Sequence, residues 1–183
     1  KQQKWVGRNM AELIKVHHCG ITVSNLEEAV EWYSTAFGLK PGLILEVSGP
    51  SGEQVLRMPP HTHRAALLPV GDFAIELLEF IPRGQEFKGR QDDVGYVYMC
   101  FEVEDLDAVY ERMSKAGYDF HTPPMRGEEG QIAGSKFCVM RDPDGKTIEF
   151  IETGPGMTAK ALHKAAKKGV RYTTFDDPLL MDG

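Results

Sequence analysis

Residues 18–39, HCGITVSNLEEAVEWYSTAFGL, combine a β-branched strand pattern, a helix cap and a run of helical periodicity. A similar run, YMCFEVEDLDAVYERMSKAGY, begins at Tyr98. Each copy leads on to a strand-like segment of the form I-E-apolar-apolar-E, which contains Glu76 in the first copy and Glu149 in the second. An internal repeat of this kind predicts two pseudo-symmetric halves. Matching valines and leucines follow the copy starts His18 and Tyr98 at the same intervals: Val23 and Val103, Leu26 and Leu106.

The sequence patterns of the two halves predict the same order of elements, β-α-β-β-β. In the first half a strand spans 15–23, Asn25 caps a helix, and Gly38 ends it. Asp105 and Gly117 take the same roles in the second half. The turn DPDG at 142–145, between two apolar runs, predicts a hairpin, and the first-half segment 39–81 is expected to hold short strands cut by turns. The expected organisation is an extension at 1–14, a first module at 15–82, a linker at 83–94, a second module at 95–153 and a C-terminal helical extension at 154–183.

Composition excludes some classes of function. The net charge of -6 argues against a nucleic-acid partner, and we expect the basic segment 160–171 to form a solvated helix face. No apolar run is long enough to span a bilayer, so no membrane partner is expected, and the first residues lack the apolar core of a signal peptide. Each of the three cysteines lies in an apolar run, which predicts buried reduced thiols and a cytoplasmic protein. They are Cys19, Cys100 and Cys138.

Glutamates inside apolar strands need a partner, a proton or a metal ion if they are buried. The alternative is that these strands have one face in water. Glu79 and Glu152 lie three residues beyond Glu76 and Glu149, so strand alternation sends them to the opposite face. The same alternation predicts opposite faces for the neighbours His17 and His18.

These motifs resemble the vicinal oxygen chelate superfamily, which includes glyoxalase I, methylmalonyl-CoA epimerase, fosfomycin-resistance proteins and extradiol dioxygenases. The runs that carry the resemblance are HHCGITVSNLEEAVEWYSTAFGL, LLPVGDFAIELLEF and DPDGKTIEFIE, and LPVG followed by IELLE most resembles the methylmalonyl-CoA epimerase branch. The resemblance implies an α+β fold of two βαβββ modules whose sheets curve into a cup around one divalent metal ion. It also implies that His18, Glu76 and Glu149 are the metal ligands.

Tyr98 departs from the family pattern, because the second module commonly opens with histidine. The tyrosine could coordinate as phenolate, hydrogen-bond a water or substrate oxygen at the metal, or indicate that the site is lost; we favour the second reading. One imidazole and two carboxylates suit Fe, Mn, Co or Mg better than a structural zinc, with Ni and Zn also possible.

The leading functional hypothesis is an isomerase, epimerase or lyase that abstracts a proton next to a carbonyl of a small oxygenated substrate. Candidate bases are His61 and His63, with His121 behind them; the alternative for these histidines is a polar turn. A second hypothesis is an Fe(II)-dependent dioxygenase. A third is a metal-free binding protein of the bleomycin-sequestering kind, for which four aromatic residues are stacking or core candidates: Tyr98, Trp32, Trp5 and Phe137. Small members of the superfamily are often homodimers, so we expect one here.

Overall fold

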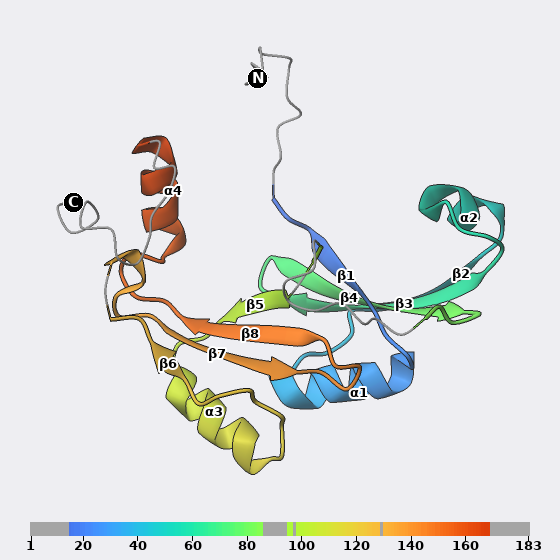
Figure 1. Ribbon diagram of the computed structural model, residues 1–183. Helices are drawn as coiled ribbons and strands as arrows, with labels where there is room; N and C mark the ends of the chain where they lie inside the picture. The colour runs from blue at the N-terminus through green and yellow to red at the C-terminus, as the bar shows by residue number, and fades with distance from the viewer. Residues whose placement is uncertain (1–14, 86–94, 97, 129, 169–183) are drawn as a thin grey trace. The chain divides into compact units, whose positions relative to one another are not determined.

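The computed structural model describes residues 15–85, 95–96, 98–128 and 130–168 (Figure 1). The chain divides into two compact units between Glu86 and Phe87, a point inside the segment expected to link the modules. The first unit contains β1 (His18–Thr22), α1 (Leu26–Phe37), β2 (Leu43–Ser48), α2 (Pro50–Leu56), β3 (Thr62–Val70) and β4 (Phe73–Ile81). The second contains β5 (Tyr98–Glu102), α3 (Leu106–Lys115), β6 (Met125–Arg126), the 3-10 turn η1 (Gly130–Ile132), β7 (Lys136–Arg141), β8 (Thr147–Glu152) and α4 (Ala159–Lys168).

Both units build their sheet in the same order. The first sheet runs β1-β4-β3-β2 and the second β5-β8-β7-β6. In each, the first strand pairs parallel with the last, and the other neighbours are antiparallel. The two strands that open the repeat, at His18 and Tyr98, are the equivalent edge strands β1 and β5. The fold is therefore the predicted α+β arrangement of two repeated modules.

The helices α1 and α3 begin and end where the sequence predicts. The side chains of Asn25 and Asp105 accept hydrogen bonds from the first-turn amides of Glu28 and Ala108. Gly38 ends α1 in the left-handed conformation, with φ of 69°, which glycine adopts without a Cβ clash. Each helix covers one face of its own sheet: Leu26, Ala29, Tyr33 and Ala36 of α1 are buried, as are Leu106 and Met113 of α3.

Because side chains alternate along a strand, each sheet has a helix-covered face and an open face. In the first unit, Ile75 and Leu77 of β4 are fully buried, whereas Glu76 between them points to the open face. In the second, Ile148 and Phe150 are buried on either side of Glu149. The two glutamates singled out by the repeat thus occupy equivalent positions on open faces.

Two sequence predictions about local structure were wrong. Residues 50–56, expected within strands and turns, form the helix α2, which Pro50 starts with a fixed φ suited to a first helical position. The expectation that all three cysteines are buried holds for Cys138 alone, since Cys19 is half-buried and Cys100 is exposed. Cys100 lies on the open face of β5, two residues from Tyr98, so an apolar sequence neighbourhood did not bury it.

The C-terminal extension contains the predicted helix, α4, in which Lys160, Lys164 and Lys167 are exposed. None of the helices in the described residues is long and apolar enough to cross a membrane. The extension at 1–14, which includes Trp5, lies outside the described residues, as do most of the linker, 86–94, and the end of the chain, 169–183.

Candidate metal centre and its surroundings

His18 and Glu76 come together on the open face of the first sheet. The parallel register pairs Gly20 with Glu76, so His18 lies two residues away on the same face. His18 Nε2 is 3.5 Å from Glu76 Oε2. Gly20 leaves room mainly for Leu78, because a Cβ at that position would lie 3.1 Å from Leu78 Cδ1 but at an ordinary contact distance of 3.6 Å from Glu76 Oε2.

His17 contacts His18, which the strand pattern did not predict. The two Nδ1 atoms are 2.8 Å apart and the rings are nearly perpendicular, at 85°. The two rings meet although strand alternation predicts opposite faces for them. His17 directly precedes the first residue of β1, and its carbonyl accepts from the N–H of Ala74 in β4. With Nδ1 of His18 engaged by His17, Nε2 is the nitrogen presented to Glu76.

Tyr98, Cys100 and Glu149 form the corresponding group in the second sheet. Cys100 pairs with Glu149 in register, where the first module has glycine opposite its glutamate. The negative charge of Glu149, with some burial, raises the pKa of Tyr98 above its ordinary value. Desolvation and a hydrogen bond with Glu149 raise the pKa of Cys100 to about 12. Both groups are therefore neutral beside the carboxylate at pH 7.

The distance between His18 and Glu76, and the chemistry of their donor atoms, fit two ligands of one divalent ion. Two ligand atoms at about 2.1 Å from one ion lie roughly 3.0–3.4 Å apart at octahedral to tetrahedral angles, close to the 3.5 Å between His18 Nε2 and Glu76 Oε2. An imidazole nitrogen and carboxylate oxygens are also suitable donors for such an ion. His18 and Glu76 are the predicted ligands that lie together within one unit. Among the described residues, no group of three or more His, Cys, Asp and Glu side chains could hold a metal ion.

Glu79 lies on the helix-covered face, as predicted. It pairs with Arg64 of the neighbouring strand, through both Nε and the terminal nitrogen of the guanidinium. Arg64 also binds Glu27 at the start of α1, with Nη1 at 2.6 Å from Oε1 and Nη2 at 2.8 Å from Oε2. The guanidinium lowers the pKa of Glu27, and the two carboxylates raise the pKa of Arg64. Glu79 therefore joins the helix to the sheet.

Glu152 has the same role in the second unit. Its Oε2 accepts from Lys136 Nζ at 3.0 Å and from the backbone N–H of Leu106 at 2.9 Å. Lys136 also binds Asp107, in the first turn of α3, at 2.8 Å, and these bonds raise its pKa. The prediction of opposite faces is thus confirmed in both modules. It leaves Glu76 and Glu149 as the members of each pair available for a ligand.

The structure places the proposed bases away from the first pair. His61 Nε2 and His63 Nδ1 are 3.2 Å apart, and both rings lie against Phe80. His63 pairs with Phe80, four residues along β4 from Glu76, which corresponds to roughly 13 Å. His121 lies in the second unit and accepts a hydrogen bond from Arg141 Nε at 3.0 Å.

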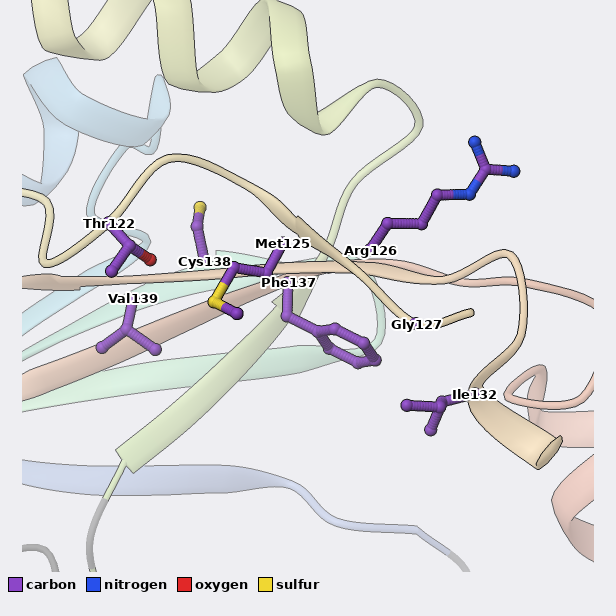
Figure 2. A pocket seen from close by; sticks show the side chains of 8 residues that line it. All are labelled: Thr122, Met125, Arg126, Gly127, Ile132, Phe137, Cys138 and Val139. Atoms are coloured by element: carbon purple, nitrogen blue, oxygen red, sulfur yellow. The ribbon is translucent and has the colours of Figure 1, made fainter. Parts of the chain in front are cut away.

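An apolar pocket of about 280 Å³ lies on the open side of the second sheet (Figure 2). In Figure 2, Phe137 and Val139 of β7 point to one side of the strand, and Met125 and Ile132 lie beside Phe137. Val139 is the register partner of Glu149, so the pocket begins next to that carboxylate. Phe137, an expected stacking or core residue, thus lines a pocket, whereas Trp32 contacts Tyr33 and Phe37 on its own helix.

Comparison with known proteins identifies the family. The model of the Glyoxalase/Bleomycin resistance protein/Dioxygenase superfamily matches residues 15–150, which cover the first module and the second as far as β8. The chain belongs to this superfamily. The glyoxalase superfamily is the group that the repeat motifs had indicated, under its other name.

The relatives of this glyoxalase-superfamily chain include enzymes. It is 28% identical over 157 residues to 2-epi-5-epi-valiolone epimerase from Actinomyces sp, covering 82% of this chain and 85% of the relative. A shorter match, 34% over 68 residues, is to lactoylglutathione lyase from Pseudomonas aeruginosa and covers 37% of this chain and 35% of the lyase. In fold, the chain resembles a glyoxalase-family protein from Bacillus cereus, with a TM-score of 0.68, 22% identity, and coverage of 80% of this chain and 99% of that one.

Proposed function

We propose that this protein is a divalent-metal-dependent isomerase, epimerase or lyase that moves a proton next to a carbonyl of a small oxygenated substrate. The observation that carries the proposal is the equivalence of two pairs on open sheet faces, His18 with Glu76 and Tyr98 with Glu149. The 28% identity to an epimerase over most of both chains supports this class of reaction.

We assign His18, Glu76 and Glu149 as ligands of one ion and Tyr98 as a hydrogen-bond donor to a substrate oxygen. When bound, such an ion supplies electrophilic stabilisation of the negative charge that develops at a carbonyl oxygen during deprotonation of the adjacent carbon. The neutral phenol of Tyr98 adds a donor to the same oxygen. The proton to be moved lies on the carbon next to the carbonyl held at the ion, so His61 and His63, about 13 Å along β4 from Glu76, are too far away to take it, and the base is another group. We also propose that the protein is a cytoplasmic homodimer.

Matched variants test the assignment. Glu76→Gln and Glu149→Gln remove proposed ligands, whereas Glu79→Gln and Glu152→Gln change glutamates three residues away on the opposite faces. Divalent metal content is measured after reconstitution with Fe(II), Mn(II), Co(II), Ni(II), Zn(II) or Mg(II). We expect one ion per chain in the wild type and in the two control variants, and at least about tenfold weaker binding in the ligand variants.

The reaction is tested in D2O with a panel of small chiral carbonyl compounds, followed by loss of the proton signal at the carbon next to the carbonyl. We expect metal-dependent exchange that is unaffected by removing oxygen and is lost in Glu149→Gln but not in Glu152→Gln. Consumption of O2 with a substrate would indicate a dioxygenase instead. Failure of the wild type to take up any ion would indicate a binding protein and overturn the proposal.

A further inference from the structure

Three alternate residues of β7 lie in line on the open face of the second sheet. Arg141, Val139 and Phe137 are each two residues apart, so their side chains share a face. The register sets their neighbours: Arg141 is opposite Thr147, which pairs with Tyr98, and Val139 is opposite Glu149. The proposed ligand Glu149 therefore lies level with the middle of this line, between a cation and an aromatic ring.

Arg141 has different partners from Arg64 and Lys136, two other basic side chains of the sheet strands. Arg64 and Lys136 each bind two carboxylates on helix-covered faces. Arg141 instead donates from Nε to His121 and, at 3.5 Å, from Nη1 to the carbonyl of Gly145. No carboxylate of the described residues lies within 4.0 Å of it, although Asp119 is nearby, since the backbone N–H of Arg141 donates to its carbonyl. A guanidinium has five N–H donors, so most of them are available to a ligand.

The other end of the line is apolar. Phe137 contributes to the pocket of about 280 Å³ with Met125, Ile132 and Val139. This volume is below the usual range for a whole drug-sized ligand and suits a single branched aliphatic or aromatic substituent. The Cα atoms of Arg141 and Phe137 are four residues apart, or about 13 Å along the strand. A small molecule can therefore contact both ends while its centre lies beside Glu149.

We propose that β7 selects the substrate by its two ends: Arg141, supported by His121, binds a carboxylate, and the Phe137 pocket binds an apolar substituent. This inference rests on the proposed function for the reaction at the centre, and it narrows the substrate class to small carboxylic acids that carry an apolar group. Arg141 favours a carboxylate because its planar donors can bind both oxygens at once.

Binding to metal-free protein tests the inference separately from catalysis. The probes are acetate, 5-methylhexanoate, 5-phenylpentanoate and the neutral 5-phenylpentanamide, whose chains are long enough to extend from Arg141 toward Phe137. They are titrated at constant ionic strength and followed through the NMR signals of the His121 ring. We expect affinity to rise at least about tenfold from acetate to 5-phenylpentanoate. Arg141→Gln should weaken the binding of 5-phenylpentanoate by about tenfold or more and leave the binding of 5-phenylpentanamide unchanged. Phe137→Ala should reduce the gain in affinity from acetate to 5-phenylpentanoate.

Arg126→Gln is the matched control, because Arg126 also lines the pocket but its guanidinium extends away from Phe137 and Ile132 (Figure 2). Equal losses of affinity for the carboxylate probes in the Arg126 and Arg141 variants would show that binding depends only on the overall positive charge, and would overturn the proposal. So would equal affinities for acetate and 5-phenylpentanoate, or no saturable binding of either. If metal uptake fails but these probes bind as expected, the proposed reaction is wrong and the binding surface stands.

Discussion

The Nδ1 atoms of His17 and His18 lie 2.8 Å apart, with the two rings nearly perpendicular. A ligating histidine is usually oriented by a hydrogen bond at its other ring nitrogen. His17 supplies that contact to His18, whose Nε2 points toward Glu76. Because an imidazole nitrogen can donate or accept, the contact is compatible with either tautomer of His18.

We predict that His17→Phe weakens divalent metal binding by about 10–100-fold, the usual effect of losing such an outer partner. His17→Asn keeps a side chain that can donate or accept and should retain most of the affinity. Calorimetric titration with Mn(II) or Co(II) measures both. Equal affinities for the wild type and His17→Phe would show that the contact does not orient the ligand.

The bond between Glu152 and the start of α3 predicts a loss of stability. Glu152→Ala leaves the N–H of Leu106 without its 2.9 Å partner, while Lys136 keeps Asp107. We expect a cost of about 1–2 kcal/mol, or about 2–8 °C in Tm. Glu152→Gln keeps an acceptor oxygen and should lose less. Thermal unfolding followed by circular dichroism compares them, and a larger loss in the Gln variant would contradict this account.

The features that could be predicted from the sequence depend on neighbours in the chain. Asn25 and Asp105 cap helices because a cap needs only the next three residues, and the DPDG turn closes its hairpin through Asp142 and Gly145. Strand alternation likewise gave the opposite faces of Glu76 and Glu79. The family pattern then supplied the choice of ligands.

The features that could not be predicted depend on contacts between distant segments or on the exact ends of strands. The contact between His17 and His18 was not predicted, because β1 starts at His18 rather than at residue 15 and His17 lies just before it. The pocket forms where η1 places Ile132 on the same pocket wall as Phe137, an arrangement that no local pattern encodes. The position of Cys100 beside the candidate ligand Glu149 could have been found in the sequence. Aligning the two copies from His18 and Tyr98 places Cys100 at the position of Gly20.

Glu27 predicts a dependence of stability on pH. Arg64 holds the pKa of Glu27 below the value of 4.5 expected for a free side chain. A carboxyl with a depressed folded-state pKa contributes stability above its unfolded pKa and loses it as pH falls through the folded value. Between pH 5 and pH 3, the wild type should therefore lose more stability than Glu27→Gln.

Urea unfolding at several pH values measures this difference, and Glu31→Gln is the control for removing a carboxylate from the same helix. Because Glu27 is exposed, the difference should shrink in 1 M salt. Parallel pH profiles for the wild type and Glu27→Gln would contradict the assigned coupling.

Gly154 follows the last strand of the second sheet at a point where the backbone is closely packed. Its N–H donates to the hydroxyl of the fully buried Ser135 at 2.9 Å. A Cβ at Gly154 would overlap the carbonyl of Ala133 and would lie 2.7 Å from the amide nitrogen of Ser135. Both are backbone atoms, so a rotamer change cannot relieve the clash, and Gly154→Ala should destabilise the protein by about 1–3 kcal/mol or more. Gly84→Ala, where a Cβ meets nothing within 4 Å, should stay within about 1 kcal/mol of the wild type or be slightly stabilising. Comparable urea midpoints for the two variants would show that the segment at Gly154 adjusts without cost.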